Sequence, residues 1–229
     1  MRPDPLHSSR CKAFTLLELL VVISIMALVI AFSRLALQGV SSSGKFNASL
    51  SDVSGILEQA RAYAIAQNTY VWVVFYEYTP PNGSPLEVYA GAFGSNDGTD
   101  IFNWAGTPAV PQPGLTSVTR LYHFRGLHLQ TTTLPNAPTG TLNTPATAAP
   151  IFQIKAQSDS GQISLPTSPG AVYWVIQFTP AGAARNAANP IDSIWLGLQP
   201  SFSPTAFDTH NVASLKVNGF TGLTTIYRQ

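Results

Sequence analysis

The feature that most restricts the fold is an apolar stretch near the N-terminus, from Phe14 to Ser33, which contains a single charged residue, Glu18. A helix rises ~1.5 Å per residue, so about 20 residues reach ~30 Å and cover the hydrocarbon core of a bilayer. Arg34 follows the stretch immediately. We therefore predict a transmembrane helix over residues 14–34.

Charges before the stretch indicate which end stays in the cytoplasm. The charged residues of the segment 1–13 are Arg2, Asp4, Arg10 and Lys12. An excess of basic residues keeps a flanking segment on the cytoplasmic side of the membrane. The rest of the chain is then expected outside the cytoplasm, held by a single pass through the membrane.

Two ordinary interpretations of the stretch are open. A secretory signal peptide has an apolar core of ~7–15 residues followed by a small-residue cleavage site, and this core is longer. A plain single-pass anchor explains the length but not Glu18, because a carboxylate within a membrane segment costs ~2.5–3.5 kcal/mol on insertion scales. Glu18 therefore favours a segment with a more specialised role.

The residues at the start of the stretch suggest that role. KAFTLLELLVVI, from Lys12 to Ile23, resembles the class III signal of type IV pilins and pseudopilins. The resemblance implies that a prepilin peptidase cuts between Ala13 and Phe14 and methylates the new amino group of Phe14. Residues 1–13 are then a leader peptide. The family usually has Gly where this chain has Ala13, which is also small.

The resemblance also implies a role for Glu18 in assembly. The cut frees a cationic amine at Phe14, and this amine enters an apolar bundle of helices when subunits pack into a filament. An unpaired buried charge is costly, and a nearby carboxylate offsets much of that cost. Glu18 of one subunit is expected to pair with the amine of Phe14 in its neighbour. The alternative is that Glu18 reaches the lipid headgroups.

Residues 35–68 are expected to continue the helix in amphipathic form. An apolar stripe at helical spacing predicts a helix from Ser49 to Gln67. The stripe consists of Leu50, Val53, Leu57, Ala60 and Ala64. Gly39 and the segment 41–44, SSSG, predict a bend or melted turn, since Gly costs ~1 kcal/mol inside a helix. Glu58 and Arg61 are three residues apart and are predicted to pair weakly.

Three later segments resemble minor pseudopilins of the GspH/FimT type. Leu57 to Asn68, which runs into a strand at Thr69 to Phe75, is similar to the pattern that closes the helix in that family. Val175 to Gly182 resembles its "F.p.G" turn, and Ala213 to Arg228 resembles its final hairpin with a "TG" turn. The resemblance implies an α+β pilin-like fold, in which a long N-terminal helix packs on an antiparallel β-sheet head.

Without the resemblance, the composition of residues 69–229 also predicts a β-rich head. The segments rich in β-branched and aromatic residues are 70–78, 86–93, 121–130, 151–155, 172–179, 194–198, 215–217 and 224–227. Turns are predicted at 80–83, 96–98 and 218–219, where Pro, Asn, Asp and Gly gather. The Thr/Pro/Ala-rich segment 131–150 is expected to form an exposed loop or insertion.

Catalytic or metal-binding patterns are weak in this head. His123 and His128 are five residues apart in one predicted strand, so they are expected on opposite faces and not as a metal-binding pair. Asp97 and Asp100 flank a Gly turn that either holds calcium or is a plain polar turn. The tryptophans are expected to fill the core between sheet and helix; they are Trp72, Trp104, Trp174 and Trp195.

The leading functional hypothesis is a structural subunit without enzyme activity or cofactor. It is a minor pilin or pseudopilin, built into a type II secretion pseudopilus or a type IV pilus-like filament for protein export. Its expected partners are prepilin peptidase, other pilins, the inner-membrane assembly platform and membrane lipid. The only cysteine, Cys11, lies in the leader, so no intrachain disulfide is possible.

A second hypothesis is a minor pilin that binds DNA or another ligand in competence or adhesion. A DNA-binding face needs several exposed basic residues together. The basic residues of the head are few and dispersed, namely Arg120, Arg125, Lys155, Arg185, Lys216 and Arg228. The formal net charge of +1 also gives no strong attractive field. Nucleic acid is therefore not expected as a partner. A membrane-anchored enzyme is a third hypothesis.

Overall fold

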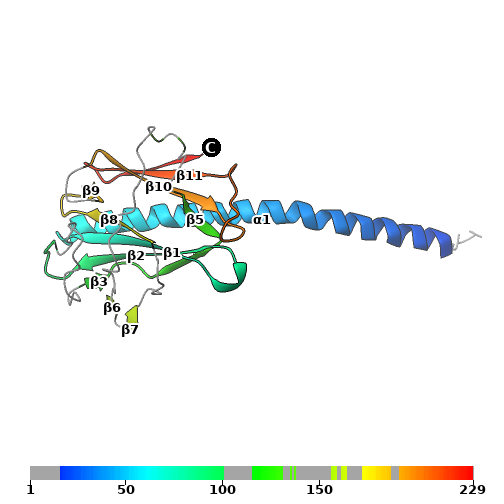
Figure 1. Cartoon of the computed structure of the whole chain (residues 1–229), viewed down its shortest axis with the longest axis horizontal. Helices are drawn as coiled ribbons and strands as arrows, with labels where there is room; N and C mark the ends of the chain where they lie inside the picture. The colour runs from blue at the N-terminus through cyan, green and yellow to red at the C-terminus, as the bar shows by residue number, and fades with distance from the viewer. Residues whose placement is uncertain are drawn as a thin grey trace, which may run out of the picture. The chain divides into compact units, whose positions relative to one another are not determined.

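The computed structural model describes residues 16–100, 115–130, 135, 137, 156–158, 161–163, 172–186 and 191–228. Residues 1–45 and 46–229 form two compact units. A long helix contributes to both units, and the strands belong to the second (Figure 1). A helix followed by antiparallel sheets is compatible with the expected α+β pilin-like fold.

Helix α1 runs from Leu16 to Ala66. It includes Gly39 and residues 41–44, so the predicted melted turn is wrong. The reason is that ending a helix and nucleating it again costs more than carrying two glycines through it, at ~1 kcal/mol each. Among the described residues, no helix has a stretch both long and apolar enough to span a membrane.

The C-terminal part of α1, residues 46–66, carries the predicted apolar stripe. The buried members of the stripe are Phe46, Leu50, Val53, Ile56, Leu57, Ala60 and Ala64. Their spacing of three and four residues places them on one side of the helix. The prediction of a helix over Ser49–Gln67 is confirmed to within one residue at its C-terminal end.

The larger sheet, which we call sheet A, contains six antiparallel strands in the described part of the chain. Its strands are β1 Val71–Tyr78, β2 Glu87–Ser95, β3 Leu115–Ser117, β4 Tyr122–Arg125, β8 Val172–Phe178 and β9 Ala184–Arg185. The order is β3-β2-β1-β8-β9, and β4 also pairs with β2. Strand β1 is central, with Phe75 opposite Ala90 on one side and Trp174 on the other.

A second sheet, sheet B, has the order β12-β11-β10-β5. Its strands are β5 Leu127–Gln130, β10 Ser193–Pro200, β11 Ala213–Asn218 and β12 Thr224–Arg228. A short hairpin of β6 Ala156–Ser158 and β7 Gly161–Ile163 is separate from both sheets. All the described pairs are antiparallel, and a pair such as β11 and β12 is joined by a short turn.

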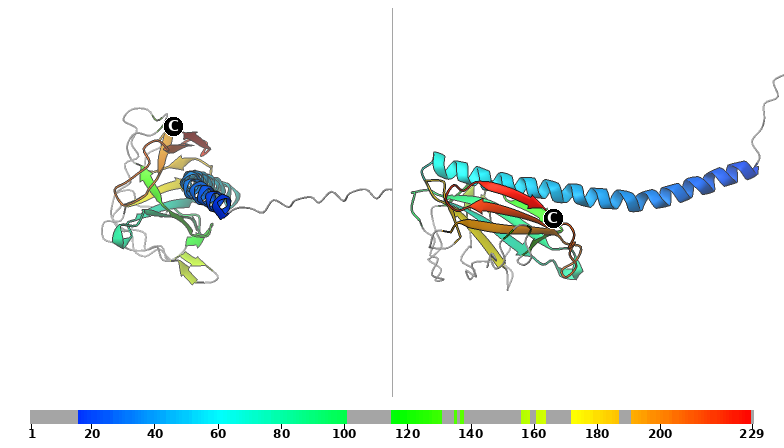
Figure 2. Two further views of the ribbon diagram at one scale, coloured as in Figure 1. Left: turned by 90° about the vertical axis from the view of Figure 1, so that its right-hand side faces the viewer. Right: turned by 90° about the horizontal axis from the view of Figure 1, so that it is seen from above.

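Strands of both sheets lie beside the C-terminal part of α1 (Figure 2). One apolar core joins residues 46–66 of α1 to both sheets. The helix supplies its buried stripe, sheet A supplies side chains such as Phe75 and Ile176, and sheet B supplies side chains such as Leu196 and Leu215. Each large apolar side chain that becomes fully buried contributes about 1.5–3 kcal/mol. The head is therefore built around the C-terminal part of α1.

Strand β1 is buried on both faces and divides its side chains between two clusters. Val71, Val73 and Phe75 face the helix, whereas Trp72, Val74 and Tyr76 belong to a second cluster on the other face of sheet A. The period of two residues explains the division. The prediction that the tryptophans fill the core between helix and sheet is therefore confirmed for Trp174 and wrong for Trp72. Trp104 lies outside the described residues.

The predicted strand 121–130 is two strands in different sheets. Strand β4 pairs with β2 in sheet A, and β5 pairs with β10 in sheet B. Gly126, with φ of +70°, turns the chain between them, a backbone conformation that glycine adopts without steric cost. The expectation that His123 and His128 lie in one strand is therefore wrong.

Most other predicted elements are present with small shifts. The segments 70–78, 86–93, 172–179, 194–198, 215–217 and 224–227 correspond to β1, β2, β8, β10, β11 and β12. The turn at 80–83 forms a short helix, η1 Pro81–Gly83, and the chain also turns at 96–98 and after Asn218. The predicted strand 151–155 and nearly all of the predicted loop 131–150 lie outside the described residues.

Candidate functional site

The first turns of α1 expose the apolar surface that the sequence analysis singled out. The exposed large apolar side chains there are Leu16, Leu17, Leu19, Leu20, Val21, Val22, Ile23, Ile25, Met26, Leu28, Val29 and Ile30. Their exposed fractions range from 44% to 85%. Such a continuous apolar surface marks a contact with lipid or with other proteins.

Glu18 lies in the first turn of α1, and its side chain is exposed. A carboxylate in this position interacts favourably with the partial positive charge at a helix N-terminus. Ser24, on the same stretch, donates its hydroxyl hydrogen to the carbonyl oxygen of Leu20 at 2.8 Å. That bond satisfies the hydroxyl within the helix. Ala13 and Phe14, the predicted cleavage and methylation residues, lie outside the described residues.

At the other end of α1, the three segments that resemble the GspH/FimT pattern meet. Arg61 on the helix donates a hydrogen bond from Nε to the carbonyl oxygen of Thr221, 160 residues later, at 2.6 Å. Gly222, the next residue, donates its N–H to the carbonyl of Asn218 at 2.7 Å and closes the hairpin between β11 and β12. The guanidinium of Arg61 thus fastens the C-terminal hairpin to the end of the helix.

Two glycines make this close approach possible. A Cβ at Gly182 would lie 2.8 Å from Cδ1 of Ile65, and one at Gly222 would lie 2.9 Å from Cδ of Arg61 and clash with the carbonyl oxygen of Gly182. Both residues also have positive φ, +81° and +66°. A side chain at position 222 would force the C-terminal hairpin and the turn after β8 apart, and one at position 182 would displace the side chain of Ile65.

The sequence analysis assigned these residues to separate motifs and did not predict that they meet. It also predicted an ion pair of Arg61 with Glu58, which is wrong, because Arg61 turns to the hairpin and the described residues contain no such pair. The available signal was the Gly in each turn motif, since a glycine in a turn marks either a positive φ or a close backbone approach, and these two glycines have both.

Exposed large apolar side chains of the head flank the residues of this junction in the sequence. Among the described residues 46–228, the exposed large apolar residues are Ile65, Phe202, Phe220, Leu223 and Ile226. All except Phe202 belong to the end of α1 or to the C-terminal hairpin. We call Ile65, Phe220 and Leu223 the hairpin patch; their exposed fractions are 44%, 66% and 57%. An apolar cluster on a surface is typical of a protein contact.

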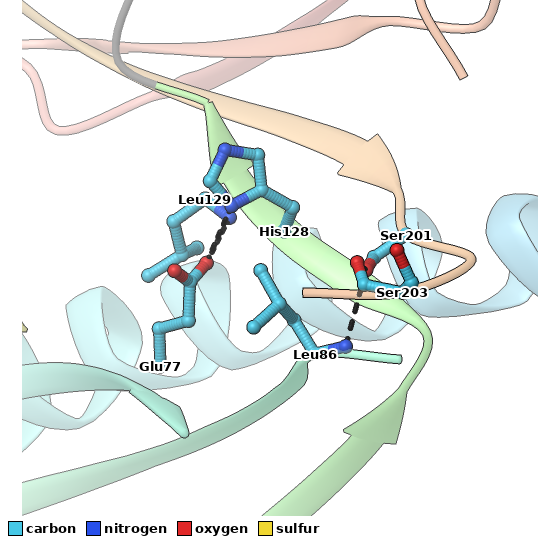
Figure 3. A network of polar contacts seen from close by, with 6 residues as sticks. All are labelled: Glu77, Leu86, His128, Leu129, Ser201 and Ser203. Atoms are coloured by element: carbon cyan, nitrogen blue, oxygen red, sulfur yellow. Dashed lines mark hydrogen bonds and ion pairs between the residues drawn. The ribbon is translucent and has the colours of Figure 1, made fainter. Parts of the chain in front are cut away.

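A network of polar contacts holds the two sheets together at a corner of the head (Figure 3). Oε2 of Glu77, on β1, accepts hydrogen bonds from Nδ1 of His128 at 2.8 Å and from the backbone N–H of Leu129 at 2.7 Å. The His128 ring stacks on Phe207 at 4.2 Å. Ser201 accepts a hydrogen bond from the backbone N–H of Leu86 at 3.1 Å. His128 is therefore a structural residue that joins β5 to β1.

His123 belongs to a separate cluster around Glu87. Its Nε2 lies 2.9 Å from Oε2 of Glu87, and its ring stacks on Tyr89 at 4.4 Å. The hydroxyl of Tyr89 donates to the same carboxylate oxygen at 3.2 Å. Burial and the charge of Glu87 raise the pKa of Tyr89. The two histidines thus pair with different carboxylates, and no group of three metal-ligating side chains occurs in the described part of the chain.

The carboxylates of the candidate calcium turn have protein partners. Asp97 accepts hydrogen bonds from the hydroxyls of Ser95 and Thr99 at 2.8 and 2.7 Å. Asp100 pairs with Arg185 and accepts a hydrogen bond from Gln177 at 2.7 Å. The first carboxylate holds a turn and the second holds an ion pair. This arrangement favours the plain polar turn over a calcium site.

Comparison with known proteins identifies the N-terminal segment. Residues 8–33 match the family model of the prokaryotic N-terminal methylation motif. This motif is the prepilin signal of type IV pilin-like proteins, and it supports the class of pilins and pseudopilins for this chain. It implies processing by a prepilin peptidase and assembly with other pilins, and the proteins that carry it are structural subunits. No curated protein and no solved structure matches the chain.

Proposed function

We propose that this chain is a minor pilin or pseudopilin of the GspH/FimT type. A prepilin peptidase removes residues 1–13 and methylates Phe14, and residues 14–34 hold the subunit in the inner membrane with the head, residues 69–229, outside the cytoplasm. The subunit then joins a type II secretion pseudopilus or a type IV pilus-like filament that serves protein export. The observation that carries the proposal is the methylation motif at residues 8–33.

The exposed apolar surface of residues 16–30 supports both stages of this life cycle. Each of these large side chains gains about 1.5–3 kcal/mol when it leaves water. For the twelve exposed side chains, the total is on the order of 20 kcal/mol. Lipid shields this apolar surface from water before assembly, and the helices of neighbouring subunits cover it in the filament.

Glu18 gives the assembly a register. In an apolar bundle, a single carboxylate needs a cation, and the methylated amine of Phe14 in a neighbouring subunit supplies one. Since Glu18 lies one turn inside the new N-terminus, the pairing fixes the axial offset between two helices. The position of Glu18 in the first exposed turn of α1 is consistent with this role.

The junction of α1 with the two turns supports the GspH/FimT type. The three short segments that resemble this type are weak as separate motifs, but they meet around Arg61 and the glycines at 182 and 222. Since these residues form one junction, a chain that has one of the three motifs is expected to have the other two as well. This convergence gives the order of the motifs a physical reason.

The hairpin patch is a suitable contact for a neighbouring subunit. Replacing both Phe220 and Leu223 with Ser is expected to reduce incorporation into the filament, because the exposed apolar area at the contact is lost. Phe202→Ser, a change at the exposed apolar residue outside the patch, is the matched control. Equal incorporation of both variants would contradict a role of the hairpin patch in subunit contact.

The basic residues of the head give little support to DNA binding. Arg185 pairs with Asp100, Arg120 lies over the ring of Tyr122 at 4.7 Å, and Nζ of Lys216 lies over the ring of Trp195 at 5.5 Å. These cations are engaged within the head at separate places. A face that binds phosphates needs several cations together and free to move.

Mass spectrometry of the native N-terminus tests the proposal directly. We expect a mature chain that begins with N-methylated Phe14, and the variant Ala13→Glu is expected to keep its leader, because a large acidic side chain replaces the small residue at the cut. A native chain that starts at Met1, or one trimmed beyond Ser33, would refute the proposed processing.

A further inference from the structure

The sequence contains two Asn-Gly pairs, Asn82-Gly83 and Asn218-Gly219, and the structure places them in very different surroundings. Asn-Gly is the dipeptide in which an asparagine side chain is most open to attack by the next backbone nitrogen, because glycine has no Cβ to hinder the approach and its backbone rotates freely. The two pairs therefore have similar intrinsic chemistry and differ in how strongly the fold restrains it.

The first pair lies in the connection between β1 and β2. Asn82 is in η1 with φ of 73° and ψ of 24°, and η1 contains no buried residue. A Cβ placed on Gly83 would have nothing within 4 Å. Among the described residues, the Asn82 side chain has no hydrogen-bond partner. Rotation of this turn therefore sacrifices no core packing and no side-chain hydrogen bond.

The second pair is held at the end of β11. Oδ1 of Asn218 accepts hydrogen bonds from the backbone N–H groups of Phe220 and Thr221 at 3.0 and 2.9 Å. The nitrogen of Gly219, which would be the nucleophile, donates its hydrogen to the carbonyl of Asp192 at 2.9 Å. Gly219 is also buried against the backbone of Ile191. Both reacting groups of this pair are occupied.

We propose that Asn82 is a site of spontaneous deamidation in the folded protein and that Asn218 is protected. The backbone nitrogen of Gly83 loses its proton and attacks Cγ of Asn82. A bond forms between this nitrogen and Cγ, the bond from Cγ to Nδ2 breaks, and ammonia leaves. Water then opens the cyclic imide and leaves aspartate or isoaspartate at position 82. No oxidation or reduction is involved, and water is the only co-reactant.

The observed backbone explains why the fold controls the rate. Ring closure requires rotation about ψ of Asn82, so the turn must open before Gly83 can reach the side chain. At Asn82 this opening is local, whereas at Asn218 it must also break the pairing of Asn218 with Ser193 and the hydrogen bonds of the hairpin. Local openings of exposed turns cost far less free energy than openings that disrupt a sheet.

Conversion at position 82 adds a negative charge to the connection between β1 and β2. If the product is isoaspartate, it also lengthens the backbone of this turn by one carbon atom. Because residues 81–85 are exposed, the core and the pairing of β1 with β2 are expected to survive. The modified and unmodified chains should therefore accumulate side by side in a long-lived preparation.

The test is peptide mapping by mass spectrometry of the full chain in detergent, incubated at mildly alkaline pH. We expect the acid form at position 82 to appear about tenfold or more faster than at position 218, which corresponds to a difference of ~1.4 kcal/mol in opening free energy. The same chain unfolded in urea serves as the control, and there the two rates should become similar.

The outcomes separate clearly. Equal rates in the folded chain, a faster rate at 218, or no conversion at 82 over a period in which the unfolded chain converts both sites would overturn the proposal. The variant Gly83→Ala is expected to slow conversion at 82 and leave the rate at 218 unchanged. A result in which Gly83→Ala does not slow conversion at 82 would also contradict the proposed attack by the nitrogen of residue 83.

Discussion

Asp97 shows how neighbouring residues set the chemistry of a single side chain. The hydroxyl of Thr99, its backbone N–H and the hydroxyl of Ser95 all donate to this carboxylate, and they lower its pKa to about 2. The side chain is fully exposed, so the shift comes from local hydrogen bonds that favour the charged form. Ser, Asp and Thr around a Gly are typical of turns in which side chains form hydrogen bonds with nearby residues of the same turn.

We expect Thr99→Ala to raise the pKa of Asp97 toward its ordinary value of 3.8, because two of the hydrogen bonds involve Thr99 and one is lost. A lowered pKa stabilises the fold above the ordinary value, and this contribution disappears as pH falls from about 3.8 to about 2. A titration of the carboxyl resonance by NMR measures the shift. An unchanged pKa in the variant would contradict the assignment.

A second residue-scale prediction concerns Glu77. Glu77→Ala removes the acceptor of His128 and of the N–H of Leu129, both partly buried. We expect the free energy of unfolding to fall by about 1–3 kcal/mol, since a donor is left without a partner. Chemical unfolding of the full chain in detergent measures the change. Glu58→Ala on the exposed side of α1 is the control, expected within about 0.5 kcal/mol of the original chain.

At the scale of elements, the decisive unit is the C-terminal half of α1 with the parts packed on it. The helix buries one stripe against two sheets, and its last turns bind the C-terminal hairpin through Arg61. These contacts join residues that are far apart in the sequence, because Arg61 and Ile65 meet Gly222 and Gly182. The head therefore cannot finish folding until its C-terminal hairpin docks on the helix.

Substitution of Gly222 and of Gly55 by alanine is expected to change the stability of the head in opposite directions. Gly222→Ala is expected to destabilise the head by ~1–3 kcal/mol, because alanine disfavours φ of +66° and its Cβ would clash with Gly182. Gly55→Ala, on the exposed side of α1 with open space around it, is expected to stabilise by about 0.5–1 kcal/mol. Thermal unfolding of both variants provides the comparison. If both substitutions changed the thermal stability in the same direction and by a similar amount, the close packing at Gly222 would be contradicted.

At the scale of the whole molecule, the proposed function depends on one charge in the apolar start of α1. Glu18→Ala is expected to leave membrane insertion intact, because the change makes the stretch more apolar, and to impair filament incorporation by about tenfold or more, because a buried amine then lacks its carboxylate. Ser24→Ala is the matched control on the same stretch, since its hydroxyl bonds only to Leu20 within the helix. Fractionation of membranes and of sheared filaments measures both effects, and normal incorporation of Glu18→Ala would refute the pairing.

Much of the architecture was predictable from local patterns. The apolar start of α1, the stripe from Leu50 to Ala64 and most strands follow from the spacing of apolar residues, since periods of 3.6 and 2 arise from backbone geometry alone. The methylation motif is equally local, because a peptidase reads a short linear segment. These features required no knowledge of which segments meet.

What only the tertiary structure decided were the contacts between distant residues. Gly126 separates His123 and His128 into two sheets, each histidine finds its own glutamate, and Arg61 binds Thr221 instead of Glu58. Sequence spacing determines which face of an element a side chain occupies, but not which other element covers that face. The partners are selected when the two sheets close around the helix, because only then do burial and hydrogen bonding reward one pairing over another.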